Sequence, residues 1–130
     1  MTIEERAELA AGWKQAGKGN CCQVVTLALA DQTGLSEEQL WNMSSGFGVG
    51  MGNMEGTCGA LVGAVMVAGL SREGKGVFGL ARSHSDSFYS RCGARTCKDL
   101  KQKVNGAPLC RCEDCVRNAV LAYGELVGLK

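Results

Sequence analysis

The sequence predicts an all-α fold, a compact bundle of about five to six helices around a buried central helix rich in glycine and alanine. Apolar residues recur at helical spacing along most of the chain. The 19 glycines fall largely between these apolar segments, where they end helices. Aromatic residues make up only 5% of the chain, and β-branched and aromatic residues do not alternate as a sandwich or barrel requires. A length of 130 residues favours one helical domain, 1–130.

Three helices are predicted in the N-terminal part of the chain. The first covers residues 2–16, with acidic residues near its start, where the helix dipole favours them. Asn20 is the expected N-cap of a second helix, which ends around Gly34. Ser36 resembles the first residue of a capping box for a short helix through Trp41.

The predicted central helix covers residues 57–70. It is apolar all round, which is typical of a helix surrounded by other helices. Gly59 and Gly63 are four residues apart and so share a face. We expect this face to let a neighbouring backbone approach closely.

The C-terminal part contains two further predicted helices, 77–89 and 113–127. The only histidine, His84, falls on the apolar face of the first of these, which favours a buried, hydrogen-bonded role over a role as ligand or proton shuttle. Between them, the pattern allows one short helix over 97–103, and a turn is expected at Asn105–Gly106.

Charge and hydropathy exclude several classes of function. Lys and Arg number 14 against 13 Asp and Glu, so the chain lacks the positive excess typical of nucleic-acid or anionic-membrane binding. The longest apolar stretch, 58–70, is shorter than the roughly 20 residues that span a bilayer. The N-terminus has no basic segment followed by an apolar one, so we expect no secretory signal and a cytoplasmic location.

A glycine-rich run covers residues 46–52. No phase of it gives the G-x-G-x-x-G fingerprint, and no strand precedes it as a dinucleotide fold requires. A turned loop is expected, because glycine supplies positive φ. Two functional alternatives stay open: a lid over the cysteines, or a backbone that approaches a ligand closely.

Eight cysteines are the most informative feature. Several sit where a helix should begin, since Cys21 follows Asn20, Cys58 follows Thr57 and Cys97 follows Thr96. The last predicted helix begins at a C-x-x-C formed by Cys112 and Cys115. Helix N-termini stabilise thiolates, which are both the nucleophiles of disulfide exchange and metal ligands. Three cysteines have no such positional argument and are expected to be incidental: Cys22, Cys92 and Cys110.

These cysteines resemble the pattern of the redox-active protein family named C_GCAxxG_C_C. The resemblance is carried by the segment 20–25, by the Cys-Gly-Ala-x-x-Gly of residues 58–63 and by two downstream cysteines, and it extends from about Gly19 to the last helix. It implies an α-helical domain with a redox role. Its four signature cysteines correspond to Cys21, Cys58, Cys97 and Cys115. The chain departs from the pattern in having Cys22 where the family often has Ala, and in adding Cys92, Cys110 and Cys112.

Three hypotheses follow for the function. The first is a thiol–disulfide redox protein, a class that includes oxidoreductases without a cofactor. In it, Cys21 pairs with Cys58, and Cys97 pairs with Cys115. The second is a metal-binding module in which the same four thiolates hold zinc or an iron–sulfur cluster. The third is a helical partner-binding domain with structural cysteines. The sequence names neither a redox partner nor a substrate, and it leaves a homo-oligomer open.

Overall fold

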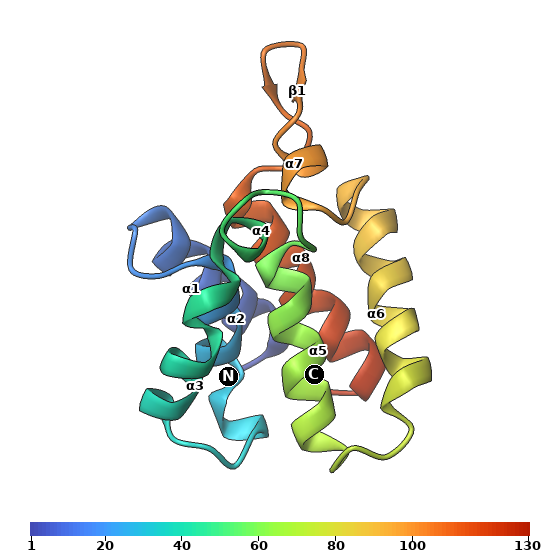
Figure 1. Ribbon diagram of the computed structural model, residues 1–130. Coiled ribbons are helices and arrows are strands. Elements are labelled where there is room, and N and C mark those ends of the chain that lie inside the picture. The colour runs from blue at the N-terminus through green and yellow to red at the C-terminus, as the bar shows by residue number, and fades with distance from the viewer.

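The computed structural model describes residues 1–130 and shows a bundle of α-helices (Figure 1), which confirms the predicted fold class. In chain order the longer elements are α1 (Ile3–Gln15), α2 (Cys21–Ala28), α3 (Glu37–Ser44), α5 (Gly59–Ser71), α6 (Val77–Cys92) and α8 (Cys112–Val127). The short elements are the 3₁₀ turns Ala30–Gln32 and Ser45–Phe47, the helical turns α4 (Gly48–Met51) and α7 (Cys97–Leu100), and the strands β1 (Lys103–Val104) and β2 (Ala107–Pro108).

Capping residues fix the starts of the first three long helices. Thr2, Asn20 and Ser36 each close a capping box, so the predicted N-caps at Asn20 and Ser36 are confirmed. The second helix is shorter than predicted: α2 ends at Ala28, and a 3₁₀ turn leads to Gly34, whose φ is 73°. A positive φ there ends the helical course, as glycine commonly does.

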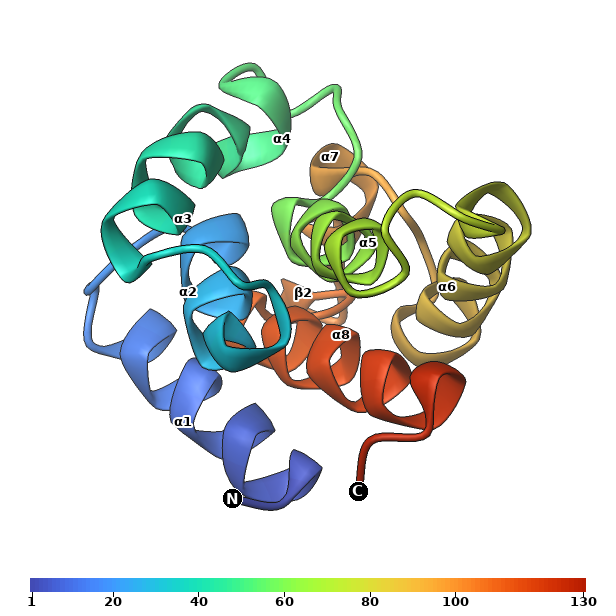
Figure 2. The same ribbon diagram turned by 90° about the horizontal axis from the view of Figure 1, so that it is seen from below.

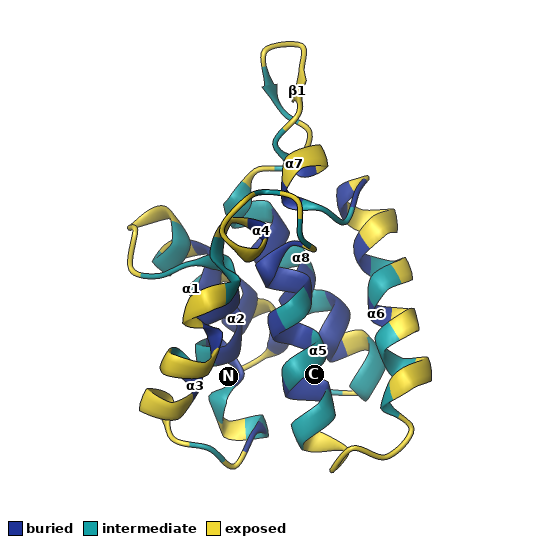
Figure 3. Cartoon of the chain, in the orientation of Figure 1, coloured by how far each residue is buried: buried dark blue, intermediate teal, exposed yellow.

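The middle of the bundle is shared by α5 and α8. Helix α5 packs on α2, α6 and α8, while α8 also contacts α1 and α2 (Figure 2). Residues of both helices fill the interior (Figure 3), among them Ala60, Ala64, Val67, Val116, Ala119 and Tyr123. Two small residues of α5, Gly59 and Gly63, let α2 come close.

The glycine face of α5 lies against the backbone of α2. A Cβ added at Gly59 would lie 2.8 Å from the Phe47 carbonyl oxygen and 3.1 Å from the Cys22 backbone nitrogen. A Cβ at Gly63 would lie 3.1 Å from the Cys22 carbonyl oxygen and 3.3 Å from Cβ of Val25. The predicted close approach at these glycines is therefore confirmed.

The C-terminal part differs from the prediction in length and detail. Helix α6 extends to Cys92, three residues beyond the expected end, and ends at Gly93 with φ 90°. The turn at Asn105–Gly106 is present, with positive φ at both residues, and it joins β1 to β2 as a small antiparallel hairpin. Two consecutive positive φ values suit the tight turns of such hairpins.

His84 is buried, with 1% of its surface exposed, and its Nδ1 donates to the Leu80 carbonyl oxygen at 2.9 Å. This confirms the buried, hydrogen-bonded role expected for it. Among the helices of the chain, none combines the length and apolar character needed to cross a membrane.

Candidate functional site: a pocket lined by cysteines

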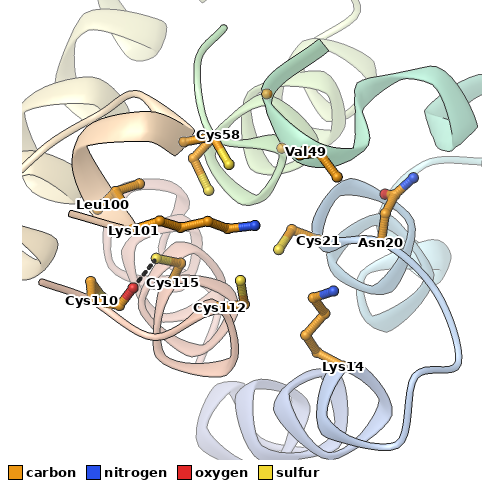
Figure 4. A pocket seen from close by; sticks show the side chains of 13 residues that line it. Lys14, Asn20, Cys21, Val49, Cys58, Leu100, Lys101, Cys110, Cys112 and Cys115 are labelled. Atoms are coloured by element: carbon orange, nitrogen blue, oxygen red, sulfur yellow. Dashed lines mark hydrogen bonds between the residues drawn. The ribbon is translucent and has the colours of Figure 1, made fainter. Parts of the chain in front are cut away.

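A pocket lies where the first turns of several helices meet (Figure 4). Cys21 is the first residue of α2, Cys58 precedes the first residue of α5, and Cys97 is the first residue of α7. The first turn of α8 contributes Cys112 and Cys115. Six cysteines line this pocket: Cys21, Cys58, Cys97, Cys110, Cys112 and Cys115. All four signature cysteines are among them.

Backbone pairing brings Cys58 and Cys97 to the same wall of the pocket. Thr57 and Thr96 form an isolated antiparallel β-bridge just before α5 and α7. The backbone N–H of Cys58 donates to the Arg95 carbonyl oxygen at 2.8 Å. The N–H of Cys97 donates to the Gly56 carbonyl oxygen at 3.1 Å. These two segments, about 40 residues apart in the chain, therefore start their helices side by side.

The glycine-rich run is a tight turn that covers part of the same pocket. Val49 and Gly50 have φ values of 53° and 55°, and both line the pocket. A Cβ at Gly50 would lie 2.7 Å from Cβ of Cys97 and 2.8 Å from the Gly56 carbonyl oxygen. Only glycine fits there, because a side chain would enter Cys97 or the neighbouring backbone. The turned loop expected from the sequence is confirmed, and its backbone forms part of the site.

The hairpin returns the chain to the pocket at Cys110. The N–H of Leu109 donates to the Gln102 carbonyl oxygen at 2.9 Å, and the N–H of Cys110 donates to the Leu100 carbonyl oxygen at 3.1 Å. Cys110 then lies against α8, where the Cys115 thiol donates to the Cys110 carbonyl oxygen at 3.8 Å. Local pairing of α7 with the segment after β2 therefore positions this cysteine.

Cys58 and Cys110 are the two thiols of the pocket whose pKa is lowered, that of Cys110 to about 3. Cys58 is the more buried of the two. Its pKa is lowered to about 4, first by the thiols of Cys115 and Cys21, and further by the backbone N–H groups of Ala60 and Leu61, while burial opposes the shift. Those N–H groups are free in the first turn of α5, so they can donate to the sulfur. Neighbouring thiols first, and then the N-terminus of the helix it precedes, therefore favour the thiolate form of the buried Cys58.

Cys21 has the opposite electrostatic setting. The Cys112 thiol lowers its pKa, but the negative charge at Cys58 and burial outweigh that effect and raise the pKa to about 12. A protonated Cys21 beside an ionised Cys58 is the favoured state of the pair, because two adjacent thiolates would repel each other. The pair therefore holds one nucleophilic sulfur and one thiol in reserve.

Two lysines add positive charge to the pocket. Lys14 comes from α1, and Lys101 follows α7; Figure 4 shows the Lys101 side chain reaching across the pocket toward Cys21. Burial lowers the pKa of Lys101, but interactions with Cys112, Cys97 and Cys21 raise it by more. Both ammonium groups compensate negative charge on the surrounding sulfurs.

Cys92, Cys110 and Cys115 form a second group of thiols. Their Sγ atoms all lie within 4.8 Å of one another. Cys92 and Cys115 are buried and Cys110 is half-buried. No sequence pattern joins the three residues, because Cys92 stands beyond the predicted end of its helix and Cys110 has no capping neighbour. The only available signal was the crowded spacing of cysteines at 110, 112 and 115.

Cys22 lies outside both groups. It is fully buried between α2 and α5, burial raises its pKa to about 12, and its sulfur lies 3.9 Å from that of Met66. This setting fits the incidental, packing role expected for Cys22. Cys92 and Cys110, expected to be incidental as well, are instead close neighbours of Cys115.

All eight cysteines are free thiols in the structure. The arrangement can support thiol exchange, because a thiolate and a protonated thiol share one pocket. It also contains sulfur groups close enough to ligate a soft metal ion. The pairing of Cys97 with Cys115 and the binding of zinc or an iron–sulfur cluster by the four signature cysteines both stay predictions.

The comparisons with known proteins agree with the cysteine pattern. Neither a curated protein nor a solved structure matches the chain. The family model with the description "Putative redox-active protein (C_GCAxxG_C_C)" matches residues 19–126, a span that contains every cysteine of the pocket. The chain belongs to this redox-active C_GCAxxG_C_C family.

Proposed function

We propose that the protein is a thiol-based redox protein in which Cys58 and Cys21 cycle between dithiol and disulfide. The observation that carries the proposal is the meeting of these two thiols in one pocket, each from the N-terminal end of a different helix. Membership in a redox-active family supports it. The lysines at the pocket support it as well, because they stabilise the anionic sulfur that exchange requires.

Cys58 acts as the nucleophile and Cys21 resolves the intermediate. The Cys58 thiolate attacks one sulfur of a disulfide R–S–S–R, so that a Cys58–S–S–R bond forms, the substrate S–S bond breaks, and one RS⁻ leaves and takes up a proton. Cys21 then attacks the Cys58 sulfur and its proton passes to the departing RS⁻, so that the Cys21–Cys58 disulfide forms and the second RSH is released. Two cysteine thiols are oxidised, one substrate disulfide is reduced to two thiols, and the reverse sequence oxidises a dithiol.

The size of the pocket limits the substrate. Its volume is about 50 Å³, room for only a few water molecules, and Cys58 is 5% exposed. Cys21 and Cys112 are more accessible. We therefore propose that the substrate is a low-molecular-weight disulfide, or a slender sulfur-bearing end of a larger molecule, that enters beside Cys21.

The mixed disulfide can be trapped with bis(2-hydroxyethyl) disulfide, a small uncharged probe. In the reduced Cys21→Ser variant, peptide mapping by mass spectrometry should find the hydroxyethylthio group on Cys58, because the thiol that resolves it in this proposal is absent. The unchanged protein should instead yield a Cys21–Cys58 disulfide. Cys58→Ser should leave Cys21 without adduct at the same exposure time.

Cys22→Ala is the matched control, because it removes a thiol adjacent to Cys21 that does not line the pocket. It should give the Cys21–Cys58 disulfide as the unchanged protein does. The proposal fails if the adduct in Cys21→Ser is carried by a different cysteine, or if every thiol of the folded protein stays free at saturating probe.

A further inference from the structure

We propose that Cys92, Cys110 and Cys115 form a three-thiolate site for a single soft metal ion of the zinc or monovalent copper class, separate from the Cys21–Cys58 pair. Three elements supply the ligands: the last residue of α6, the segment after β2 and the first turn of α8. Cys110 and Cys115 are close in the chain, but Cys92 is distant from both, so its convergence with them is a property of the tertiary structure. The proposal does not depend on the redox function.

The sulfur spacing is close to that of a metal–thiolate centre. The three Sγ atoms lie within 4.8 Å of one another. Ligand sulfurs bound to one zinc at about 2.3 Å stand roughly 3.8 Å apart in a tetrahedron. Side-chain rotation therefore has to close the group by at most about 1 Å, which cysteine permits without backbone movement.

The surroundings bury the group and orient one of its sulfurs. The Asn118 side-chain amide donates to the Cys92 sulfur at 3.6 Å, a bond that a thiolate can also accept. Cys92 and Cys115 are 5% and 2% exposed and belong to the hydrophobic core, with Cys110 packed against it. A hydrogen bond from Asn118 is the kind of outer contact that orients a metal ligand.

The ligand chemistry selects a soft ion. The group contains three sulfurs and no carboxylate or imidazole. Magnesium and calcium require oxygen ligands, whereas zinc and monovalent copper favour thiolates. Three thiolates leave net negative charge after binding, which the N-terminus of the 16-residue α8 offsets.

The fourth coordination position lies toward the cysteine pocket. Cys110 and Cys115 line both the pocket and the three-thiolate site, whereas Cys92 lines only the latter. Zinc would take a water from the pocket as its fourth ligand, and monovalent copper would be complete with three sulfurs. Cys92 is thus the residue whose removal tests the metal site without touching the proposed redox pair.

The test is titration of the reduced, anaerobic protein with Zn²⁺ and, in a separate arm, with Cu⁺, each against a chromophoric chelator. We expect one ion per chain in at least one arm, together with ultraviolet thiolate-to-metal absorption. Cys92→Ala should weaken binding by more than about 100-fold, the upper range for disturbing an outer-sphere partner. Cys22→Ala, which removes a buried thiol outside the group, should bind as the unchanged protein does.

Circular dichroism checks that each variant is folded. If Cys92→Ala does not fold, Cys110→Ser tests the same site at a half-buried position. The proposal is overturned if neither ion binds at one per chain, if a folded Cys92→Ala or Cys110→Ser keeps full affinity, or if a folded Cys22→Ala loses it. Iron with inorganic sulfide in the anaerobically purified protein would overturn it too, because that composition means a cluster and not a single ion.

Discussion

Gly59→Ala tests whether the close contact of α5 with α2 builds the cysteine pocket. The added methyl group would lie 2.8 Å from the Phe47 carbonyl oxygen and 3.1 Å from the Cys22 backbone nitrogen. Both are backbone atoms, so no flexible side chain can move aside. The helix N-terminus that holds Cys58 must then shift away from α2, which carries Cys21.

The expected loss of stability is the difference between two effects. Overpacking in a rigid contact costs about 1–3 kcal/mol. Replacing glycine by alanine inside a helix returns up to about 1 kcal/mol, and less at the first helical residue, which Gly59 is. The free energy of unfolding should therefore fall by about 1–2 kcal/mol.

Urea unfolding in the presence of a reductant measures this change while all thiols stay reduced. Gly12→Ala is the matched control, because Gly12 lies inside α1 with nothing within 4 Å of the added Cβ. That variant should gain about 0.5–1 kcal/mol from helix propensity alone. The reasoning is refuted if Gly59→Ala is as stabilising as Gly12→Ala.

Three further predictions concern charge. Asp31→Asn should destabilise by about 1 kcal/mol at neutral pH, since Asp31 pairs with the buried Arg6 but is itself 59% exposed to screening water. Arg6 lowers the pKa of Asp31 to about 2, so the ion pair stabilises the fold fully above about pH 3.9, the pKa of the unfolded state, and its contribution is lost as pH falls through 2. The urea midpoints of the variant and the unchanged protein should therefore converge in acid, and a difference in midpoint that does not depend on pH would contradict the pairing. Burial lowers the pKa of His84, so the free energy of unfolding should fall as pH drops below about 6.5, and His84→Leu should weaken that pH dependence. The same loss of stability in acid for both proteins would show that His84 is not its cause. Lys101→Gln should slow alkylation of the pocket thiols by anionic iodoacetate at low salt, about threefold or more beyond any slowing with neutral iodoacetamide, and an equal loss with both reagents would rule out electrostatic attraction of the anion.

Helix starts were the most predictable part of the fold. Asn20 and Ser36 carry their capping partners three residues ahead, so their helices could be placed to within a residue. The end of α2 was less predictable. Its apolar pattern continues toward Gly34, but the chain turns into a 3₁₀ segment at Ala30, where packing and not propensity decides.

The candidate site was predictable in its parts. The position of Cys21 and Cys97 at helix starts followed from Asn20 and Thr96, and both hold in the structure. Cys58 is one residue earlier than expected, since it precedes the first residue of α5 and is not within it. The backbone N–H groups at that helix end still favour the thiolate of Cys58, as expected for a cysteine at a helix start.

The sequence by itself determined the helical class, the helix-terminal placement of the signature cysteines and the glycine face of the central helix, because capping, periodicity and the missing Cβ act over a few residues. Only the tertiary structure decided which thiols meet. The bridge between Thr57 and Thr96 and the hairpin that returns Cys110 join segments far apart in the chain. Cys110 and Cys115 are near each other in the chain, but Cys92 joins them only because α6 packs against α8.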